Sequence, residues 1–338
     1  MNGKAAVLGA GSWGTALAVH LGRRGPVALW ARAEDEPARI AEHGENRRYL
    51  PGIPLSPGVS VTAEVGQALD GAAVVVLAVP TQFVRGFLDR HRAAGSWLPP
   101  IAIAAKGIEV GTLALPSAIV GQVLGADAEA RSVAFSGPSF AREVVAGEPT
   151  AVVAACADGS QAERVQQLFS HDNLRVYTSP DAVGVQLAGA LKNVVAIAAG
   201  VLDGLNHGSN ALAALITRGN AEISRLGVAL GARRDTFMGL AGMGDLVLTC
   251  TGHLSRNRLL GRELARGRSL AEIVGGMNMV AEGVETTRAA AVLARATGVE
   301  MPIVDQVHAI LFEGMEPRRA LAALLARPLK AETEDPSP

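Results

Sequence analysis

Short, continuously apolar runs alternate with longer amphipathic stretches in the first half of the chain. The runs are rich in Val, Ile, Leu and Ala, and they lie at residues 4–9, 26–32, 59–62, 72–80, 100–107, 132–137 and 150–156. Between most of them, Ala, Leu, Arg and Glu recur at helical spacing. Continuous apolar runs are typical of strands covered on both faces, and their alternation with helices indicates a parallel, doubly wound sheet.

The strand pattern stops after the sequence LRVYTSPDAVG, and helical stretches separated by Gly and Pro make up the rest of the chain. This change predicts a first domain over residues 1–180 and a second, all-helical domain over residues 181–330. The last residues are polar and broken by proline, so we expect residues 331–338 to form a solvated tail.

One helical stretch, GVQLAGALKNVVAIAAGVLDG at residues 184–204, is almost wholly apolar but carries Lys192 and Asn193 near its middle. Its length approaches that of a membrane span. A lysine near the centre of a span costs about 2.5 to 3.5 kcal/mol, however, and glycine and alanine predominate here over leucine. We therefore expect the buried central helix of a soluble domain, and no membrane span.

Composition and charge exclude several classes of partner. Of the 338 residues, 49% are hydrophobic, enough for two cores, and the net charge is -1 without a polybasic run, so nucleic acid and anionic lipid are not expected partners. Cys156 and Cys250 form no CxxC motif and the histidines lack metal-ligand spacing, so we expect neither a disulfide framework nor a metal site. The opening MNGKAAVLGAG leaves no room for a signal peptide, which favours the cytoplasm.

The sequence VLGAGSWGTALAVHLGRRG places Gly9, Gly11 and Gly14 in a GxGxxG motif between the first strand and an alanine-rich helix. In this setting the first glycine permits a tight turn, the second lets backbone N–H groups approach a pyrophosphate, and the third allows the helix to pack closely on the strand. A glycine turn of purely structural use is the less favoured alternative. The motif therefore predicts an N-terminal, Rossmann-like dinucleotide-binding domain, so the fold class is α/β with a C-terminal all-α domain.

The tip of the second strand indicates which dinucleotide binds. The sequence LWARAED puts Arg32 at this tip, with Glu34 and Asp35 just beyond it. A guanidinium suits the 2′-phosphate of NADPH, whereas a carboxylate would hold the ribose 2′-hydroxyl of NADH. NADPH is therefore favoured over NADH. If Arg32 instead lies along the adenine or points to solvent, both cofactors stay usable.

Polar groups follow two of the later strands. The run IAIAAKGIE puts the ammonium group of Lys106 at the carboxyl edge of the sheet, where doubly wound folds bind ligands. The run FSGPSFAREV follows the next strand, and its residues Gly137, Pro138 and Ser139 lead into a helix start with exposed N–H groups. Each feature alone is more often structural than functional.

Lys192 shares a helix face with small residues such as Ala188, Gly189 and Ala196, which would let a ligand or another helix come close. Desolvation there would lower the lysine pKa toward neutrality, which suits a group that both donates and accepts a proton. A structural, ion-paired lysine fits this helix equally well.

A further polar set lies in LAGMGDLVLTCTGHLSRNRLLGREL. Asp245 follows glycine there, and Ser255, Arg256 and Asn257 begin a new helix. Ser255 is a typical N-cap residue, and free N–H groups beside a guanidinium form an anion site. An ordinary capped helix that faces solvent is the alternative.

Nine motifs occur in the order in which the bacterial NAD(P)-dependent glycerol-3-phosphate dehydrogenases carry them. They are GAGSWGTALA, NRRYLPG, AAKGIE, SGPSFAREV, GVQLAGALKNVVAIAAG, ITRGNAEISRLG, GMGDLVLTCT, SRNRLLG and VAEGVETT. The chain resembles this family over nearly its whole length. The resemblance implies a Rossmann-like and a helical domain with the active site between them, a homodimer, and reduction of dihydroxyacetone phosphate to sn-glycerol 3-phosphate, a phospholipid precursor.

The same resemblance implies roles for individual residues. Lys192 matches the catalytic general acid/base, and Lys106 and Asp245 line the same site. The implied substrate contacts are Lys106, Gly137, Ser139, Lys192, Asp245, Ser255, Arg256 and Asn257. The implied cofactor contacts are Gly9, Gly11, Ser12, Trp13, Gly14, Arg32, Tyr49, Lys106, Ala141, Arg256, Val280 and Glu282. Asp245 would orient either Lys192 or a substrate hydroxyl, and Asn193 would either orient the amine or link to a neighbouring loop.

Two alternatives stay open at this point. A related dehydrogenase of a β-hydroxy acid or of 6-phosphogluconate would share the two-domain plan, but a carboxylate substrate would need an anion site other than the SRN helix start. A non-enzymatic dinucleotide sensor would need no proton donor, so a buried Lys192 opposite Lys106 at the sheet edge argues against it.

Overall fold

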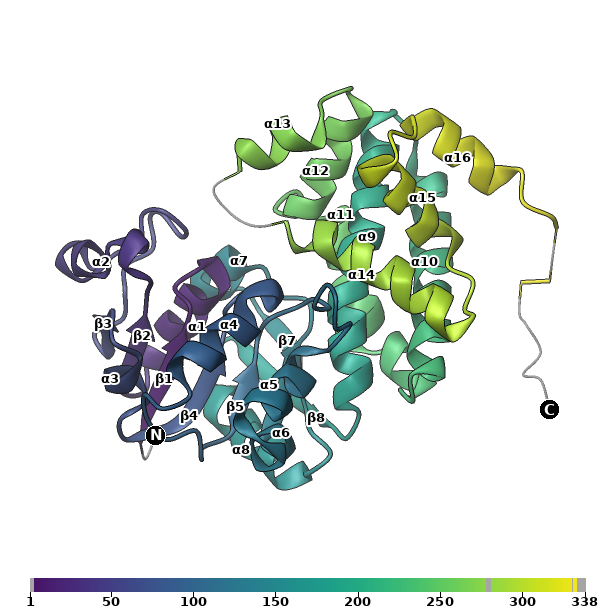
Figure 1. Cartoon of the computed structure of the whole chain (residues 1–338). Coiled ribbons are helices and arrows are strands. Elements are labelled where there is room, and N and C mark those ends of the chain that lie inside the picture. Colours follow the sequence, from purple (N-terminus) through teal and green to yellow (C-terminus); the bar gives the residue numbers. More distant parts are fainter. Residues whose placement is uncertain (1–2, 278–280, 330, 333–338) are drawn as a thin grey trace.

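The computed structural model of the chain describes residues 3–277, 281–329 and 331–332. Within these residues the strands form one eight-stranded sheet in the order β3-β2-β1-β4-β5-β6-β7-β8. The strands are β1 (Lys4–Leu8), β2 (Val27–Trp30), β3 (Val59–Thr62), β4 (Ala72–Leu77), β5 (Ile101–Ile103), β6 (Ser132–Ser136), β7 (Thr150–Ala155) and β8 (Leu174–Ser179). Figure 1 shows the sheet in one half of the molecule and a helical assembly in the other.

Helices cover both faces of the sheet. They are α1 (Ser12–Gly22), α2 (Pro37–His43), α3 (Val65–Leu69), α4 (Thr81–His91), α5 (Pro116–Leu124), α6 (Ala126–Ala130), α7 (Ala141–Ala146) and α8 (Gly159–Phe169). Along β1, Ala5 and Val7 join one apolar cluster with α1 and α8, whereas Ala6 and Leu8 join another with α3, α4 and α5. Since both faces are buried, the doubly wound architecture predicted from the apolar runs is confirmed.

The sheet is not parallel throughout, and here the sequence prediction is wrong. Neighbouring strands run parallel from β3 to β6, but β7 is antiparallel to β6, and β8 is parallel to β7. A parallel connection needs a crossover of a dozen or more residues, usually with a helix that returns along the sheet. The connection after β6 holds only the six-residue α7, which packs against α1, so the chain re-enters the sheet from the edge at which β6 ends.

The apolar runs predicted most strand positions, but some ends differ. The run at residues 100–107 yields only Ile101–Ile103, because the chain leaves the sheet before Lys106. The edge strand β8 was not among the predicted runs, since its residues alternate between buried and exposed positions instead of forming a continuous apolar run.

The second half of the molecule is built around α9 (Ala182–Gly204). Its other elements are α10 (Ser209–Ala229), the short helices η2 (Arg234–Met238) and η3 (Leu240–Gly244), α11 (Asp245–Thr251), α12 (Arg256–Ala265), α13 (Leu270–Gly275), α14 (Glu282–Thr297), α15 (Pro302–Phe312) and α16 (Pro317–Leu325). Among the described residues, α9 alone is long and apolar enough to cross a membrane, but 94% of its most apolar window is buried inside the chain. The expectation of a buried central helix is confirmed.

Glycines bring α12 directly against α9. A Cβ atom on Gly200 of α9 would lie 1.9 Å from the carbonyl oxygen of Arg258, and one on Gly261 of α12 would lie 1.9 Å from that of Ile197. The two helices therefore touch backbone to backbone. Gly200 and Gly261 therefore serve close helix packing within the chain.

The change from mixed to helical structure falls between β8 and α9, which end and begin at Ser179 and Ala182. The division into domains at residue 180 stays a prediction. Most of the expected tail, residues 333–338, lies outside the described residues.

Candidate active site

The GxGxxG glycines differ in what surrounds them. Gly9 has a φ of +117°, and a Cβ on it would lie 2.8 Å from the backbone carbonyl of Ala78, so a side chain is excluded at this turn. A Cβ on Gly14 would lie 1.9 Å from the carbonyl oxygen of Gly9, so α1 packs closely on the strand end. Apart from its neighbours along the chain, no protein atom lies within 4 Å of the Cβ position of Gly11. This open space is where a pyrophosphate would approach the backbone.

The start of α1 is suited to an anion. No side chain caps it and no acidic residue lies in its first turn, so its N–H groups keep their positive potential. Ser12 Oγ donates to the carbonyl oxygen of Tyr49 at 2.5 Å. Trp13 and Ala141 pack in one small apolar cluster beside α1. Four residues with implied cofactor roles thus lie around the glycine motif, which fits a bound dinucleotide.

Arg32 at the tip of β2 is held by a carboxylate. Its Nε and one terminal nitrogen donate to the two oxygens of Asp35 at 2.8 and 2.9 Å, and Tyr49 Oη donates to Asp35 Oδ1 at 2.8 Å. The guanidinium of Arg48 is 3.3 Å from the same oxygen. Two cations surround one buried carboxylate here, and both arginine side chains are about half exposed, which leaves positive charge beside the place of a ribose.

Lys106 and Lys192 meet at one carboxylate. Lys192 Nζ donates to Asp245 Oδ1 at 2.5 Å, and Lys106 Nζ donates to Asp245 Oδ2 at 2.6 Å. Lys192 is 7% exposed and Asp245 1%. The three residues predicted to be catalytic are therefore brought into contact at a buried point.

Each of the three comes from a different element. Lys106 lies in the loop after β5, at the carboxyl edge of the sheet, and Lys192 lies in the middle of α9. Asp245 is the first residue of α11 and directly follows the π-helical turn η3. Such turns occur often at functional sites, since they redirect side chains within a helix. The site thus joins the sheet half of the molecule to the helical half.

Burial and charge shift the ionisation of this group in opposite directions. Burial lowers the pKa of Lys192 to about 8, with the neighbouring Lys106 acting in the same direction and Asp245 opposing both. Burial disfavours the charged form of Asp245, but the two ammonium groups outweigh it and hold the pKa of Asp245 below its usual value. Lys192 can therefore change its protonation near neutral pH while Asp245 stays ionised.

Two hydroxyl groups complete the surroundings of Asp245, and the sequence did not single out either. Lys192 Nζ donates to Thr249 Oγ1 at 2.9 Å, and Thr249 Oγ1 donates to the backbone carbonyl of Asp245 at 2.6 Å. Ser136 Oγ lies 3.4 Å from Asp245 Oδ2. Thr249 follows Asp245 by four residues, so helical spacing places them on one face and could have identified it. No local signal distinguishes Ser136.

The loop after β6 contacts Lys106. The carbonyl oxygen of Gly137 accepts hydrogen bonds from Lys106 Nζ at 3.4 Å and from Ser139 Oγ at 2.9 Å. Both residues with implied substrate contacts therefore lie close to Lys106. Their substrate roles stay predictions.

The start of α12 has the cap that the sequence predicted. Ser255 is the N-cap, and its Oγ accepts from the backbone N–H of Arg258 at 3.3 Å. Asn257 is buried, and its Oδ1 accepts from the backbone N–H of Gly283 at 3.1 Å, which ties this helix start to α14. Arg256 is exposed over the residue as a whole. Burial of its guanidinium lowers the pKa of Arg256, and the nearby Glu282 acts in the opposite direction.

Glu282 is the first residue of α14 and lies close to Arg256 and the two lysines. Burial raises its pKa, and Arg256, the backbone N–H of Thr81, Lys106 and Lys192 act in the opposite direction, so the carboxylate faces both halves of the molecule. Val280, the remaining implied cofactor contact, lies outside the described residues. Asn193 is buried, and its backbone carbonyl oxygen lies 2.9 Å from the place of a Cβ atom on Gly283. The role of the Asn193 side chain stays open.

The arrangement suits an anionic substrate and a proton transfer. Two ammonium groups share one carboxylate, so a net positive charge stays at the site and can stabilise a developing oxyanion. In the described part of the chain, no group of three or more His, Cys, Asp or Glu side chains could hold a metal ion. The cysteines Cys156 and Cys250 are buried free thiols.

Comparison with known proteins covers both halves. The family model described as the N-terminus of NAD-dependent glycerol-3-phosphate dehydrogenase matches residues 4–162, and that of its C-terminus matches residues 181–322. A glycerol-3-phosphate dehydrogenase [NAD(P)+] of Syntrophotalea carbinolica is 50% identical over 332 residues, which are 97% of this chain and 99% of the relative. That of Geobacter sulfurreducens is 49% identical over 335 residues, with 98% and 99% covered.

Solved structures agree with the sequence comparisons. The crystal structure of a glycerol-3-phosphate dehydrogenase from Coxiella burnetii superposes with a TM-score of 0.91 at 38% identity, and the match covers 96% of this chain and 99% of that one. Sheet, helical half and sequence therefore all point to one group of oxidoreductases. The chain belongs to the NAD-dependent glycerol-3-phosphate dehydrogenase family.

Proposed function

We propose that the chain reduces dihydroxyacetone phosphate to sn-glycerol 3-phosphate with NADPH or NADH, reversibly, and so supplies glycerophospholipid synthesis. Family membership over nearly the whole chain supports this reaction. The observation that carries it is the contact of Lys106 and Lys192 with Asp245, where the carboxyl edge of the sheet meets α9. A dinucleotide sensor would need no such buried donor.

The nicotinamide cofactor, when bound, supplies the hydride that adds to the substrate carbonyl carbon. The chain positions it through the open backbone at Gly11 and the uncapped start of α1. Arg32 and Arg48 lie where a 2′-phosphate would be recognised, which supports a preference for NADPH. Asp35 neutralises part of this charge, which leaves NADH usable.

Lys192 acts as the general acid in the reduction. As the carbonyl oxygen gains negative charge, the Lys192 ammonium group donates a proton to it, and the neutral amine takes the proton back in the reverse reaction. Its lowered pKa makes both states accessible near neutrality. Lys106 holds the substrate and stabilises the same charge. Asp245 keeps both ammonium groups in place, because each donates to one of its oxygens.

The phosphate of the substrate binds at the start of α12. The guanidinium of Arg256 and the first N–H groups of the helix supply the attraction. Gly137 and Ser139 contact the substrate from the other side. Anchoring the phosphate away from the carbonyl fixes the reacting atoms, which reduces the entropic cost of the reaction.

Nicotinamide absorbance tests the function directly. The purified full-length chain should oxidise NADPH when dihydroxyacetone phosphate is added, and sn-glycerol 3-phosphate should form in equal amount. Oxidation of NADPH by a β-keto acid but not by the phosphate ester would instead support the related dehydrogenases. Dinucleotide binding without turnover of either compound would support the sensor.

We further propose a homodimer in the cytoplasm, with a dinucleotide-binding domain over residues 1–180, a catalytic domain over residues 181–330 and a solvated tail over residues 331–338. The family resemblance supports the dimer, and the change from strands to helices near residue 180 supports the division. Light scattering of the eluting protein measures the mass, and a monomer at micromolar concentration would contradict the dimer.

A further inference from the structure

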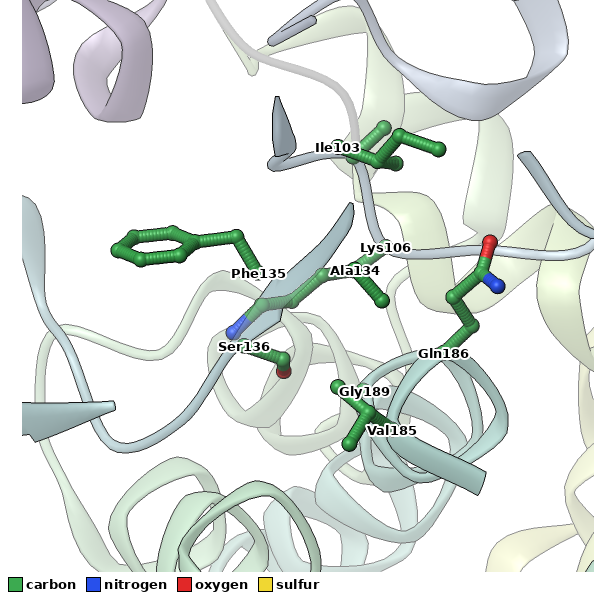
Figure 2. A pocket seen from close by; sticks show the side chains of 9 residues that line it. Ile103, Lys106, Ala134, Phe135, Ser136, Val185, Gln186 and Gly189 are labelled. Carbon is green, nitrogen blue, oxygen red and sulfur yellow. The ribbon is translucent and has the colours of Figure 1, made fainter. Parts of the chain in front are cut away.

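Ser136 occupies a position between the sheet and the catalytic group. It is the last residue of β6 and is 4% exposed. Its Oγ lies 3.4 Å from Asp245 Oδ2, the oxygen that also accepts the hydrogen bond from Lys106. Figure 2 shows the Lys106 side chain ending beside Ser136, with Gly189 on the facing helix. The hydroxyl therefore contacts the carboxylate from the strand side.

Gly189 of α9 makes this approach possible. A Cβ at this position would lie 2.8 Å from Ser136 Oγ and 3.5 Å from Cγ of Lys106. The first distance is shorter than real Cβ atoms show, and the second is an ordinary contact. Any side chain at residue 189 would therefore displace the serine hydroxyl before it disturbed the lysine.

A cavity of about 10 Å³ adjoins Ser136 and Lys106, together with Ala134 and Gly189. A serine hydroxyl can rotate about its C–O bond, so a hydrogen bond sets the direction of its O–H group. The available acceptor for the Ser136 hydroxyl in this direction is Asp245 Oδ2.

The two oxygens of Asp245 have matching partners. Oδ1 is approached by the ammonium of Lys192 and, at 3.4 Å, by the hydroxyl of Thr249. Oδ2 is approached by the ammonium of Lys106 and by the hydroxyl of Ser136. Without the serine, Oδ2 would keep Lys106 as its single partner, and the orientation of the carboxylate would be less fixed.

We propose that Ser136 is a positioning residue that fixes the carboxylate of Asp245 between Lys106 and Lys192, and that Gly189 leaves the space for its hydroxyl. The proposal rests on the proposed function. Ser136 does not reach the substrate itself; it acts through Asp245 on the lysine that donates the proton.

The test compares Ser136→Ala with Ser132→Ala. Ser132 lies on the same strand, is 3% exposed and donates to the carbonyl oxygen of Ala128, away from the site, so it is a matched loss of a buried hydroxyl. Ser136→Ala should lower kcat for dihydroxyacetone phosphate by about fivefold, on the scale of one hydrogen bond, with KM for NADPH unchanged. The control should keep the wild-type kcat.

A pH profile separates positioning from a general structural effect. Without the serine hydroxyl, more negative charge stays on Asp245 and holds the Lys192 proton more tightly, so the alkaline limb of kcat for reduction should move to higher pH. Equal kcat values and equal profiles for Ser136→Ala and Ser132→Ala would overturn the proposal. An inactive wild-type chain would instead refute the proposed function, which keeps the two failures apart.

A double-mutant cycle with Gly189→Ala tests the contact itself. The added methyl group should displace the serine hydroxyl and lower kcat in the wild-type background. In the Ser136→Ala background the hydroxyl is absent, so the same methyl group should cost little more. If the two losses in kcat multiply, the residues act independently and the proposed contact is wrong. Melting temperatures identify any variant whose loss reflects unfolding.

Discussion

Lys192 Nζ lies 2.5 Å from Asp245 Oδ1, and both side chains are buried. A buried ammonium paired with a carboxylate would ordinarily be a structural ion pair. Here a second lysine shares the same carboxylate, so the group carries one positive charge more than its own carboxylate balances. That excess positive charge is available to an anionic substrate.

Lys192→Met should abolish turnover while cofactor binding persists. The variant keeps much of the side-chain volume but has no proton to donate, and general acid catalysis contributes about a hundredfold to ten-thousandfold. Steady-state rates and NADPH fluorescence titration measure the two effects. Lys4→Met is the control, since Lys4 lies at the amino end of β1, away from the site, and its Nζ donates a hydrogen bond to the carbonyl oxygen of Gln67. Residual turnover near the wild-type rate would remove Lys192 from the mechanism.

The two directions of the reaction should respond oppositely to pH. Reduction needs the protonated amine of Lys192, so its kcat should fall as the pH rises through about 8, the value to which burial lowers the lysine pKa. Oxidation needs the neutral amine, so its kcat should rise over the same interval. Profiles with matching slopes in both directions would show that another group limits the proton transfer.

Arg256→Ala should weaken the binding of substrate more than it slows chemistry. A hydrogen bond to a charged group is worth about 1.5 to 3 kcal/mol, so KM for dihydroxyacetone phosphate should rise about tenfold to a hundredfold. Arg266→Ala is the control, because Arg266 follows the same helix and pairs with Glu263 at 3.2 Å. An unchanged KM would mean that the phosphate binds elsewhere.

Arg32→Ala should raise KM for NADPH and leave KM for NADH nearly unchanged. The guanidinium at the tip of β2 is about half exposed and faces the place of a 2′-phosphate, a group that NADH lacks. Arg39→Ala is a matched control, since Arg39 of α2 makes a similar pair with Glu36, the acidic N-cap residue three positions before it. Equal increases for both cofactors would show that Arg32 contacts a part that they share.

Stability should fall in mild acid because of His20. Its ring is 1% exposed, stacks on His171 at 3.8 Å and donates from Nε2 to the carbonyl oxygen of Phe169. Burial lowers the pKa of His20 from 6.5 to about 4, with His171 and Arg23 adding to this and Phe169 and Asp172 opposing it. The neutral ring is thus favoured in the folded state, so its contribution is complete above pH 6.5 and is lost as the pH falls toward 4.

Urea unfolding at several pH values measures this loss. The linked free energy amounts to about 3 kcal/mol over the interval. His20→Phe keeps an aromatic ring against His171 but cannot titrate, so stability of this variant should depend less on pH. His43→Phe, at an exposed position of α2, should keep the wild-type dependence. A slope unchanged in His20→Phe would assign the acid sensitivity to other groups.

The local pattern of apolar and polar residues predicted most of the fold and the kinds of side chain at the site. Continuous apolar runs marked strands buried on both faces, and the small residues around Lys192 marked a closely packed helix. The reversal of β7 was not predicted, since the direction of a strand depends on where the preceding connection ends, and α7 has no sequence signal for that. The edge strand β8 was missed because half of its residues face solvent.

The residues of the site were easier to predict from the sequence than the contacts between them. Asp245 is 53 residues from Lys192 and 139 from Lys106 in the sequence, so their meeting depends on how the two halves of the chain pack. The pairing of Arg32 with Asp35 needed only three residues of separation, yet the sequence alone left open whether the guanidinium faced solvent or a partner. Ser136 could not be recognised because its role arises from α9, which approaches at Gly189.

The close packing of α9 against α12 at Gly200 and Gly261 bears on which substrates the enzyme accepts. Since α9 and α12 touch through their backbones, no flexible side chain separates the helix that carries Lys192 from the helix that starts at Arg256. The distance between the proton donor and the phosphate site is then fixed by the packing of the two helices. Under the proposed roles, this distance selects the length of the ketone's carbon chain, and a longer sugar phosphate would fit only if the helices moved apart.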